Sequence, residues 1–304
     1  MQPLSRRDLL QRTALALTAG CGALAISRSA LAIPPIGRIR PSHLKLSIAA
    51  YSYRQYLTAK PPKMDLFDFV NLAADMALDG VEPTSYYFPP HVTPDYLNRL
   101  KLHAFKLGLD ISGTAVGNNF CLPPGPKRDE QIEQVRNWID RAADLDAPII
   151  RIFAGNVPRG TTEDQAIGWA VECIKAVLPY AATKGIVLAL ENHGGITATP
   201  EQILKLVKAI DAPNFGVNLD TGNFHGSDQY AQIAQLAPYA YNVQVKTEIH
   251  GAGSRSTEAA DLARIIGILR EARYSGYVVL EYEAAEDPMM AIPKYIKILR
   301  QLIS

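Results

Sequence analysis

Three acidic residues in the second half of the sequence each end a short apolar run that is typical of a buried strand. These residues are Glu191, Asp220 and Glu281. A carboxylate in the interior is costly unless it is paired or binds a metal, and three on neighbouring strands repel one another. A divalent cation neutralises such a cluster efficiently. The pattern therefore predicts a metal site; structural ion pairs of single acids with Lys246 or Arg151 are the alternative.

Further polar residues lie two positions apart on the predicted strands and point into the barrel with the acids. Successive side chains on a strand point to opposite faces, so residues two apart share a face. We therefore expect His193 to point inward with Glu191, and Asn242, Gln244 and Lys246 to point inward together from another strand. The acids are then surrounded by amides and cations.

Strands and helices that alternate along the chain must position these residues. Short apolar, β-branched runs predict eight strands, at 44–50, 80–83, 109–116, 148–153, 186–191, 215–220, 241–246 and 277–282. Helical periodicity predicts eight helices, near 64–78, 94–107, 128–145, 163–184, 200–210, 228–236, 257–273 and 289–303. This alternation indicates parallel strands joined by crossover helices.

The number and order of these elements predict an α/β fold, a single (β/α)8 TIM barrel over residues 44–304. Eight strand–helix pairs in about 260 residues match the usual size of that barrel. An open doubly wound sheet is the alternative, but no glycine-rich nucleotide-binding fingerprint follows any predicted strand. In a barrel the active site lies at the C-terminal ends of the strands, where the three acids stand.

Several runs resemble those of the xylose-isomerase-like sugar isomerase/epimerase family. The likeness covers Ser47 onward and is carried by Leu190-Glu191-Asn192-His193-Gly194-Gly195, Leu219-Asp220-Thr221-Gly222-Asn223, Gly276-Tyr277-Val278-Val279-Leu280-Glu281-Tyr282, Ala50-Tyr51-Ser52-Tyr53-Arg54 and Arg151-Ile152-Phe153-Ala154-Gly155. The resemblance implies a metal held by Glu, Asp, His and Glu, which correspond by position to Glu191, Asp220, Gln244 and Glu281.

The departure from the family pattern is Gln244, which stands where most relatives have a histidine. A glutamine can ligate through its carbonyl oxygen, so the predicted set becomes four oxygen donors, three of them anionic. Oxygen donors suit hard cations, and the sequence therefore favours Mn²⁺ or Mg²⁺ over Zn²⁺.

The resemblance further implies that Glu191 and Glu281 flank the substrate as an acid–base pair, without deciding which of the two is the base. With the metal polarising a substrate oxygen, one glutamate removes a proton and the other returns it, through an enediolate. We expect a sugar or keto-sugar isomerase or epimerase. Two alternatives are a metal-dependent lyase that cleaves 3-keto-glycosides by elimination and a non-catalytic, metal-containing sugar-binding protein. Product mass separates the first from an isomerase, and solvent-deuterium exchange separates the second.

Four residues are candidates for binding the substrate: His193, Asn223, Lys246 and Arg151. Each also has a plain structural interpretation. His193 can support a metal ligand by a hydrogen bond, Lys246 can form an ion pair with Glu283, and Asn223 can belong to a turn. Arg151, like Glu82, can form a buried pair in the barrel interior.

The first 32 residues resemble a twin-arginine signal peptide. Arg6 and Arg7 precede an uncharged apolar run, and Ala30-Leu31-Ala32 is a small-residue cleavage site. We therefore expect export to the periplasm without stable membrane insertion after cleavage; a lipoprotein anchored at Cys21 is a minor alternative. Residues 33–43 predict an extended, proline-rich linker.

The charge indicates which class of partner to expect, and the cysteine content indicates whether a disulfide is present. Removing residues 1–32 takes away four arginines and one aspartate, so the formal charge falls from +1 by three to −2. A basic surface is not indicated, and we expect a small carbohydrate as partner rather than nucleic acid. Cys121 and Cys173 lack metal-site spacing, so two thiols are favoured over a disulfide. Oligomerisation stays open.

Overall fold

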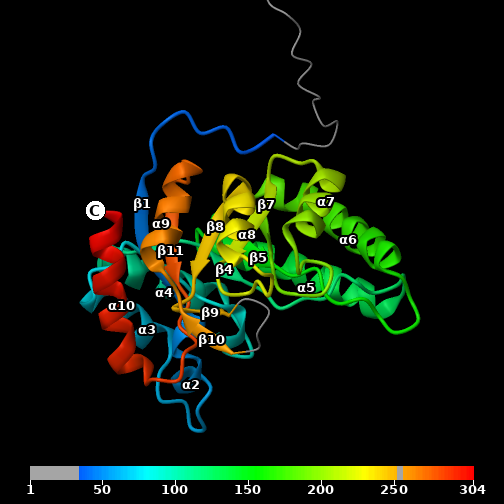
Figure 1. Cartoon of the computed structure of the whole chain (residues 1–304). Helices are drawn as coiled ribbons and strands as arrows, with labels where there is room; N and C mark the ends of the chain where they lie inside the picture. The colour runs from blue at the N-terminus through cyan, green and yellow to red at the C-terminus, as the bar shows by residue number, and fades with distance from the viewer. Residues whose placement is uncertain (1–33, 252–255) are drawn as a thin grey trace, which may run out of the picture. The chain divides into compact units, whose positions relative to one another are not determined.

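A ring of parallel strands forms the centre of the protein in a computed structural model that describes residues 34–251 and 256–304 (Figure 1). The strands are β1 (Leu44–Ala49), β2 (Gly80–Glu82), β3 (Asp110–Ile111), β4 (Thr114–Ala115), β5 (Ile149–Ile152), β6 (Val187–Glu191), β7 (Phe215–Asp220), β8 (Ala240–Val245) and β11 (Gly276–Leu280). Their order is β3-β2-β1-β11-β8-β7-β6-β5-β4. Because the two outermost strands, β3 and β4, follow each other in the chain, the sheet curves into a nearly closed barrel, as predicted.

The third predicted strand, 109–116, is divided in two. Its first half, β3, pairs with β2, and its second half, β4, pairs with β5. The chain changes partner at Ser112 and Gly113, where the Ser112 hydroxyl lies 2.7 Å from that of Ser47 on β1. The barrel closes across this change of partner.

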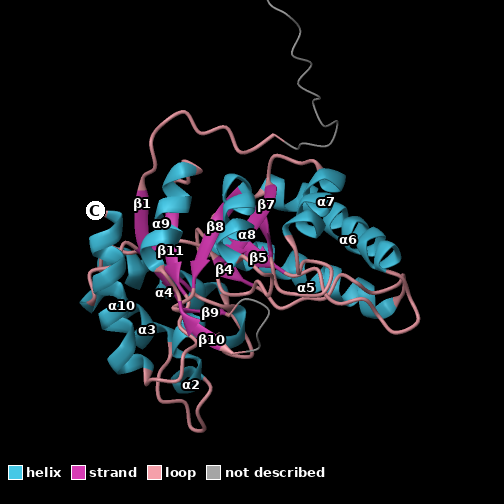
Figure 2. Cartoon of the chain, viewed as in Figure 1, coloured by secondary structure: helices cyan, strands magenta, loops and turns pink. Residues whose placement is uncertain are grey.

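Helices surround the strands (Figure 2). They are α3 (Leu66–Asp75), α4 (Pro94–Lys106), α5 (Pro126–Asp144), α6 (Glu163–Thr183), α7 (Pro200–Ile210), α8 (Gln229–Leu236), α9 (Leu262–Glu271) and α10 (Pro288–Ile303), in addition to the short α2 (Arg54–Leu57). Thr162 and Thr199 cap α6 and α7, where capping boxes satisfy the free amides of the first turns. Both helix starts are as the sequence predicts.

One helix is shorter than predicted. The sequence indicates a helix over 257–273, but residues Thr257–Ala259 form β10, which pairs antiparallel with β9 (Glu248–His250). The helix starts at Leu262 because the Asp261 side chain accepts a hydrogen bond from the amide of Arg264. The β9–β10 hairpin lies at the C-terminal end of the barrel (Figure 1).

The core consists of aliphatic side chains between strands and helices. Fully buried strand residues include Ile48, Ile150, Leu188, Val217 and Val243. Burying an aliphatic side chain of this size stabilises a fold by about 1.5–3 kcal/mol. The strands are therefore held firmly, which keeps the residues at their ends in register.

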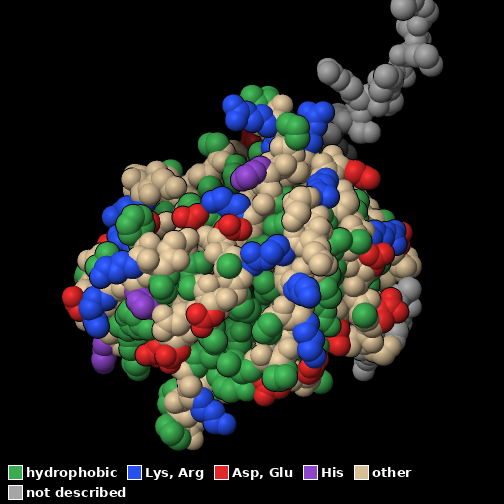
Figure 3. Space-filling view, turned by 90° about the vertical axis from the view of Figure 1, so that its left-hand side faces the viewer, with side chains coloured by type: hydrophobic (Ala, Val, Ile, Leu, Met, Phe, Trp, Pro, Cys, Tyr) green, Lys and Arg blue, Asp and Glu red, His purple; other side chains and the backbone are tan. Residues whose placement is uncertain are grey.

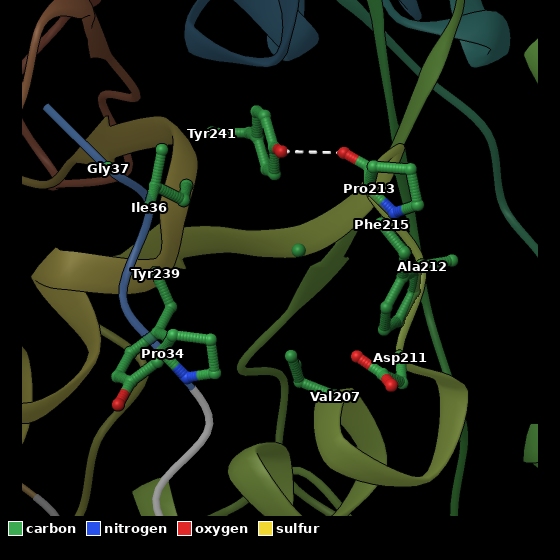
Figure 4. A pocket seen from close by; sticks show the side chains of 11 residues that line it. Pro34, Ile36, Gly37, Val207, Asp211, Ala212, Pro213, Phe215, Tyr239 and Tyr241 are labelled. Carbon is green, nitrogen blue, oxygen red and sulfur yellow. Dashed lines mark hydrogen bonds between the residues drawn. The ribbon is translucent and has the colours of Figure 1, made fainter.

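The proline-rich segment 34–43 has no regular secondary structure and crosses the N-terminal end of the barrel, drawn in blue in Figure 1. The amide of Ile36 donates to the carbonyl of Pro238, and the Arg38 guanidinium donates to the carbonyl of Ala240 at 2.5 Å. A pocket of about 400 Å³ lies between this segment and the starts of β7 and β8 (Figure 4). There the Tyr241 hydroxyl donates to the carbonyl of Pro213.

Other sequence predictions concern the surface and the termini. The signal peptide, with Cys21, lies outside the described residues, so export stays a prediction. In the described part of the chain no helix is long and apolar enough to cross a membrane. Cys121 and Cys173 are buried, free thiols. On the face drawn in Figure 3, Lys and Arg side chains are interspersed with Asp and Glu.

Candidate active site

Six ionisable side chains gather where the barrel strands end. They come from β2, β5, β6, β7 and the residues that follow β8 and β11, and each is at most 9% exposed: Glu82, Arg151, Glu191, Asp220, Lys246 and Glu281. Buried charges of this number must be compensated by one another, so their pairing decides what the site can do.

Glu191, at the end of β6, receives contacts on both carboxylate oxygens. Arg151 Nε lies 2.9 Å from Oε2, while His193 Nδ1 and Asn223 Nδ2 lie 2.7 and 2.9 Å from Oε1. Burial raises the pKa of Glu191, but the Arg151 charge and the His193 hydrogen bond outweigh it, so the pKa is below its ordinary value. The same contact raises the pKa of His193. Glu191 is therefore held as a carboxylate.

Arg151 and His193 both lie against the same aromatic ring. The Arg151 guanidinium carbon lies 4.0 Å from the centroid of the Phe153 ring, and the His193 ring lies 4.5 Å from the same ring. Arg151 also donates to the carbonyl of Val116 at 3.0 Å. Arg151 and His193, which both contact Glu191, therefore also pack against the Phe153 ring.

Lys246 forms the second buried ion pair. Its ammonium lies 3.1 Å from Asp220 Oδ2, 2.5 Å from Glu283 Oε2 and 3.2 Å from the side-chain oxygen Oδ1 of Asn223. Because Asn223 donates to Glu191 and accepts from Lys246, its amide joins the two ion pairs. Burial lowers the pKa of Lys246, but the acids around it raise the pKa well above its ordinary value.

The aliphatic part of the Lys246 side chain packs directly against Gly222. A Cβ at Gly222 would lie 2.6 Å from Lys246 Cδ and 3.0 Å from the carbonyl oxygen of Glu248. We expect Gly222→Ala to displace the ammonium and to lower kcat/KM by about 100-fold, the usual cost of misplacing a group by 1 Å. Steady-state kinetics check this. Gly267→Ala, on α9 with no atom within 4 Å, is the matched control; equal activity of the two variants would contradict the prediction.

Glu281, directly after β11, differs from the other acids. Among the residues that the structure describes, no hydrogen bond or ion pair reaches its carboxyl group. Burial raises the pKa of Glu281 well above its ordinary value, and the charges of Asp220 and Glu191 raise it further despite the opposing Lys246. Burial likewise raises the pKa of Asp220, to about 6. Glu281 is thus favoured in its protonated form, whereas Glu191 is favoured as a carboxylate.

Gln244 faces a different set of neighbours. Its carbonyl oxygen accepts from the amide nitrogen of Asn218 at 2.7 Å, and its own amide nitrogen donates to Glu82 at 2.6 Å. Burial raises the pKa of Glu82 to about 7, opposed by the hydrogen bonds from Asn242 and Gln244. Both polar groups of Gln244 are therefore engaged within the barrel.

The acidic residues fit a divalent cation by charge and donor type. Asp220 Oδ2 is buried and has no hydrogen-bond partner, although Lys246 lies near it, and Glu281 has no partner in the described residues. As the side chains stand, no three His, Cys, Asp or Glu groups of the described chain are placed to share one ion. Glu191, Asp220 and Glu281 supply anionic oxygens of the kind that a hard cation prefers, and Gln244 supplies a neutral oxygen that already accepts a hydrogen bond from Asn218.

Some functional contacts were not predicted from the sequence. The amide of Asn192 donates to the carbonyl of Asp220, and its oxygen accepts from the Asp220 amide, so it links the ends of β6 and β7. Its place between Glu191 and His193 was the available signal. Tyr86, in the loop after β2, brings its hydroxyl to 3.5 Å from Arg151.

A small pocket lies beside His193, which contacts Glu191. It has a volume of about 170 Å³ and lies beside His193 and Phe153. Asn118, Asn119 and Asn156 also line it. An aromatic ring with amide groups around it is a surface suited to polar organic ligands.

Comparisons with known proteins agree with this fold. A family model described as a xylose isomerase-like TIM barrel matches residues 70–302. The uncharacterised protein MJ1311 of Methanocaldococcus jannaschii is 20% identical over 57% of this chain, and the match spans 64% of that protein. A 3-oxo-isoapionate decarboxylase of Pectobacterium atrosepticum is 22% identical over 67% of this chain and 68% of its own length.

Solved structures give the same result. A D-psicose 3-epimerase in the presence of D-fructose has a TM-score of 0.67 at 18% identity, covering 84% of this chain and 89% of that one. The 3-keto-D-glucoside 4-epimerase of E. coli has a TM-score of 0.66 at 15% identity over 86% and 99%. The IolI protein with a bound zinc atom has 0.68 at 17% over 85% and 96%. The chain belongs to the xylose isomerase-like TIM barrel family.

Proposed function

We propose that this protein is an isomerase or epimerase of a sugar or keto-sugar that moves a proton through an enediolate. One observation carries the proposal: two buried glutamates, Glu191 and Glu281, stand at the strand ends of one barrel, flanked by the buried cations Arg151 and Lys246, and their surroundings shift their pKa values in opposite directions. Environments that drive the pKa values of two acids apart assign one as base and the other as acid.

The roles of the two glutamates follow from their surroundings. Glu191, kept ionised by Arg151 and His193, removes the proton from the carbon beside the substrate carbonyl. Glu281, whose pKa is raised by burial, supplies a proton to the adjacent carbon or to the opposite face.

The cationic and amide groups stabilise the charge that develops on the substrate. Lys246 and Arg151 are fixed by buried ion pairs, and Asn223 and His193 lie between them and Glu191. Donors held in place before the reaction stabilise an oxyanion without having to reorganise. These four residues are the proposed substrate contacts.

Glu191, Asp220 and Glu281 would hold a divalent cation, for which their oxygen donors favour Mn²⁺ or Mg²⁺. Such an ion would polarise the substrate carbonyl and acidify the neighbouring C–H bond. The zinc atom in the IolI structure supports metal use in this family.

Elimination is the second candidate reaction. The pocket of about 170 Å³ beside His193 offers space for a leaving group next to the base, Glu191. A 3-keto-glycoside would then lose its aglycone after the same proton removal. Because the chain carries a predicted export signal, we propose that either substrate is an unphosphorylated carbohydrate.

The first experiment incubates the purified protein with ketohexoses, D-fructose among them, and with a methyl 3-keto-glucoside in D₂O. We expect deuterium to enter the sugar while substrate mass is otherwise conserved, as NMR and mass spectrometry measure. Dialysis against a chelator should lower the rate, and Mn²⁺ should restore it. Release of methanol would instead show elimination. Ligand-dependent melting shifts without deuterium exchange in any sugar would show a binding protein and overturn the proposal.

A further inference from the structure

Four buried polar residues form a closed ring of hydrogen bonds inside the barrel. Gln244 donates to Glu82 Oε1 at 2.6 Å, and Asn242 donates to Glu82 Oε2 at 2.7 Å. Asn218 donates to Gln244 at 2.7 Å and accepts from Asn242 at 2.8 Å. All four side chains are at most 2% exposed. The ring connects β2 with β7 and β8.

The direction of each hydrogen bond in the ring follows from one carboxylate. A carboxylate only accepts, so Gln244 and Asn242 must both turn their amide nitrogens toward Glu82. The carbonyl oxygen of Gln244 then points away from Glu82 and needs a donor, which Asn218 supplies. The side-chain oxygen of Asn218 then accepts from Asn242. Reversing any one amide would oppose two donors or two acceptors.

The ring also determines what Gln244 can do. Its carbonyl oxygen is the atom that would bind a cation. One lone pair of that oxygen accepts from Asn218 at 2.7 Å, and the amide nitrogen is held by Glu82, so the ring fixes the plane of the amide. Turning the oxygen toward an ion would leave the buried amide of Asn218 without a partner. Asp220 Oδ2, by contrast, is buried without a hydrogen-bond partner among the described residues.

We propose that Gln244 is a positioning residue: with Glu82, Asn218 and Asn242 it locks the ends of β2, β7 and β8 together and does not bind a cation. A metal at this site is held by the carboxylates alone, which is the part of the inference that rests on the proposed function. The remainder concerns the ring and is independent of metal or substrate.

An exchange of the two side chains tests the ring. In Glu82→Gln, the new side chain brings an amide nitrogen to the amide nitrogen of Gln244, so two donors oppose each other. In Gln244→Glu, two carboxylates face each other. In the double variant Glu82→Gln/Gln244→Glu, the amide at position 82 donates to the new carboxylate and accepts from Asn242, and the carboxylate at position 244 accepts from Asn218. All four hydrogen bonds are then kept.

We expect each single variant to melt about 4–10 °C lower, since buried polar groups lose partners, and the double variant to recover most of the loss. Glu258→Gln, on the exposed strand β10, is the control for loss of a glutamate charge. If a single variant does not fold, a folded double variant still supports the ring. A double variant no more stable than the weaker single variant would overturn it.

Titration calorimetry with Mn²⁺ tests the second half of the inference without any substrate. We expect the double variant to bind Mn²⁺ within about threefold of the unmodified protein, because the carboxylate at position 244 stays in the ring. Binding tightened tenfold or more would show that position 244 is a ligand and overturn this half. If neither protein binds Mn²⁺, the metal in the proposed function is wrong and this half of the inference falls with it, while melting still tests the ring.

Discussion

Glu281→Gln is expected to lower kcat by about 10²–10⁴-fold, the usual contribution of a positioned acid or base. The amide has the shape of the protonated acid but cannot release a proton. Because burial and the neighbouring acids raise the pKa of Glu281, the neutral amide should be accommodated without loss of folding. The melting temperature should therefore be unchanged or higher. Loss of activity without loss of stability identifies a residue that acts in the chemistry.

Steady-state kinetics and thermal melting, measured on the same preparations, provide the test. Glu286→Gln is the matched control, since Glu286 forms only a surface ion pair with Lys294. Glu191→Gln should lower kcat by a similar factor, although it also loses the carboxylate that pairs with Arg151. Full activity of both variants would show that neither glutamate takes part in proton transfer.

Arg151→Met is expected to destabilise the fold by about 3–5 kcal/mol, because it leaves the buried Glu191 carboxylate without its cation. The ion pair is 2.9 Å long, and both side chains are at most 7% exposed, so water replaces little of the lost interaction. The stacking of the guanidinium on Phe153 is lost as well. Urea unfolding followed by circular dichroism measures the change.

A second variant separates charge from packing at this position. In Arg151→Met/Glu191→Gln both charges are removed, so the double variant should be more stable than Arg151→Met alone. Replacing a whole buried ion pair is often nearly neutral, whereas removing one partner is not. If the two substitutions add independently, the pair contributes little, and Arg151 acts only through its packing.

The order of the elements was predictable because each depends on local chemistry. Runs such as 187–191 are apolar and short, Thr199 is followed three residues later by Gln202, and Gly185 takes a φ of +69° where α6 gives way to β6. Propensity and periodicity act over a few residues. The β9–β10 hairpin was missed because its strands have three residues each and are defined by their pairing with each other.

The candidate site likewise has features that the sequence predicts and features that only the tertiary structure decides. That Glu191, Asp220 and Glu281 meet at one end of the barrel followed from the sequence alone, because parallel strands bring their C-terminal ends together. Which partner each polar group takes was decided by the tertiary structure: Arg151 with Glu191, Lys246 with Asp220, and Gln244 with Glu82 across the barrel. These pairs are 26 to 162 positions apart, and side-chain direction across such separations depends on barrel curvature and on the hydrogen bonds that every buried group must find.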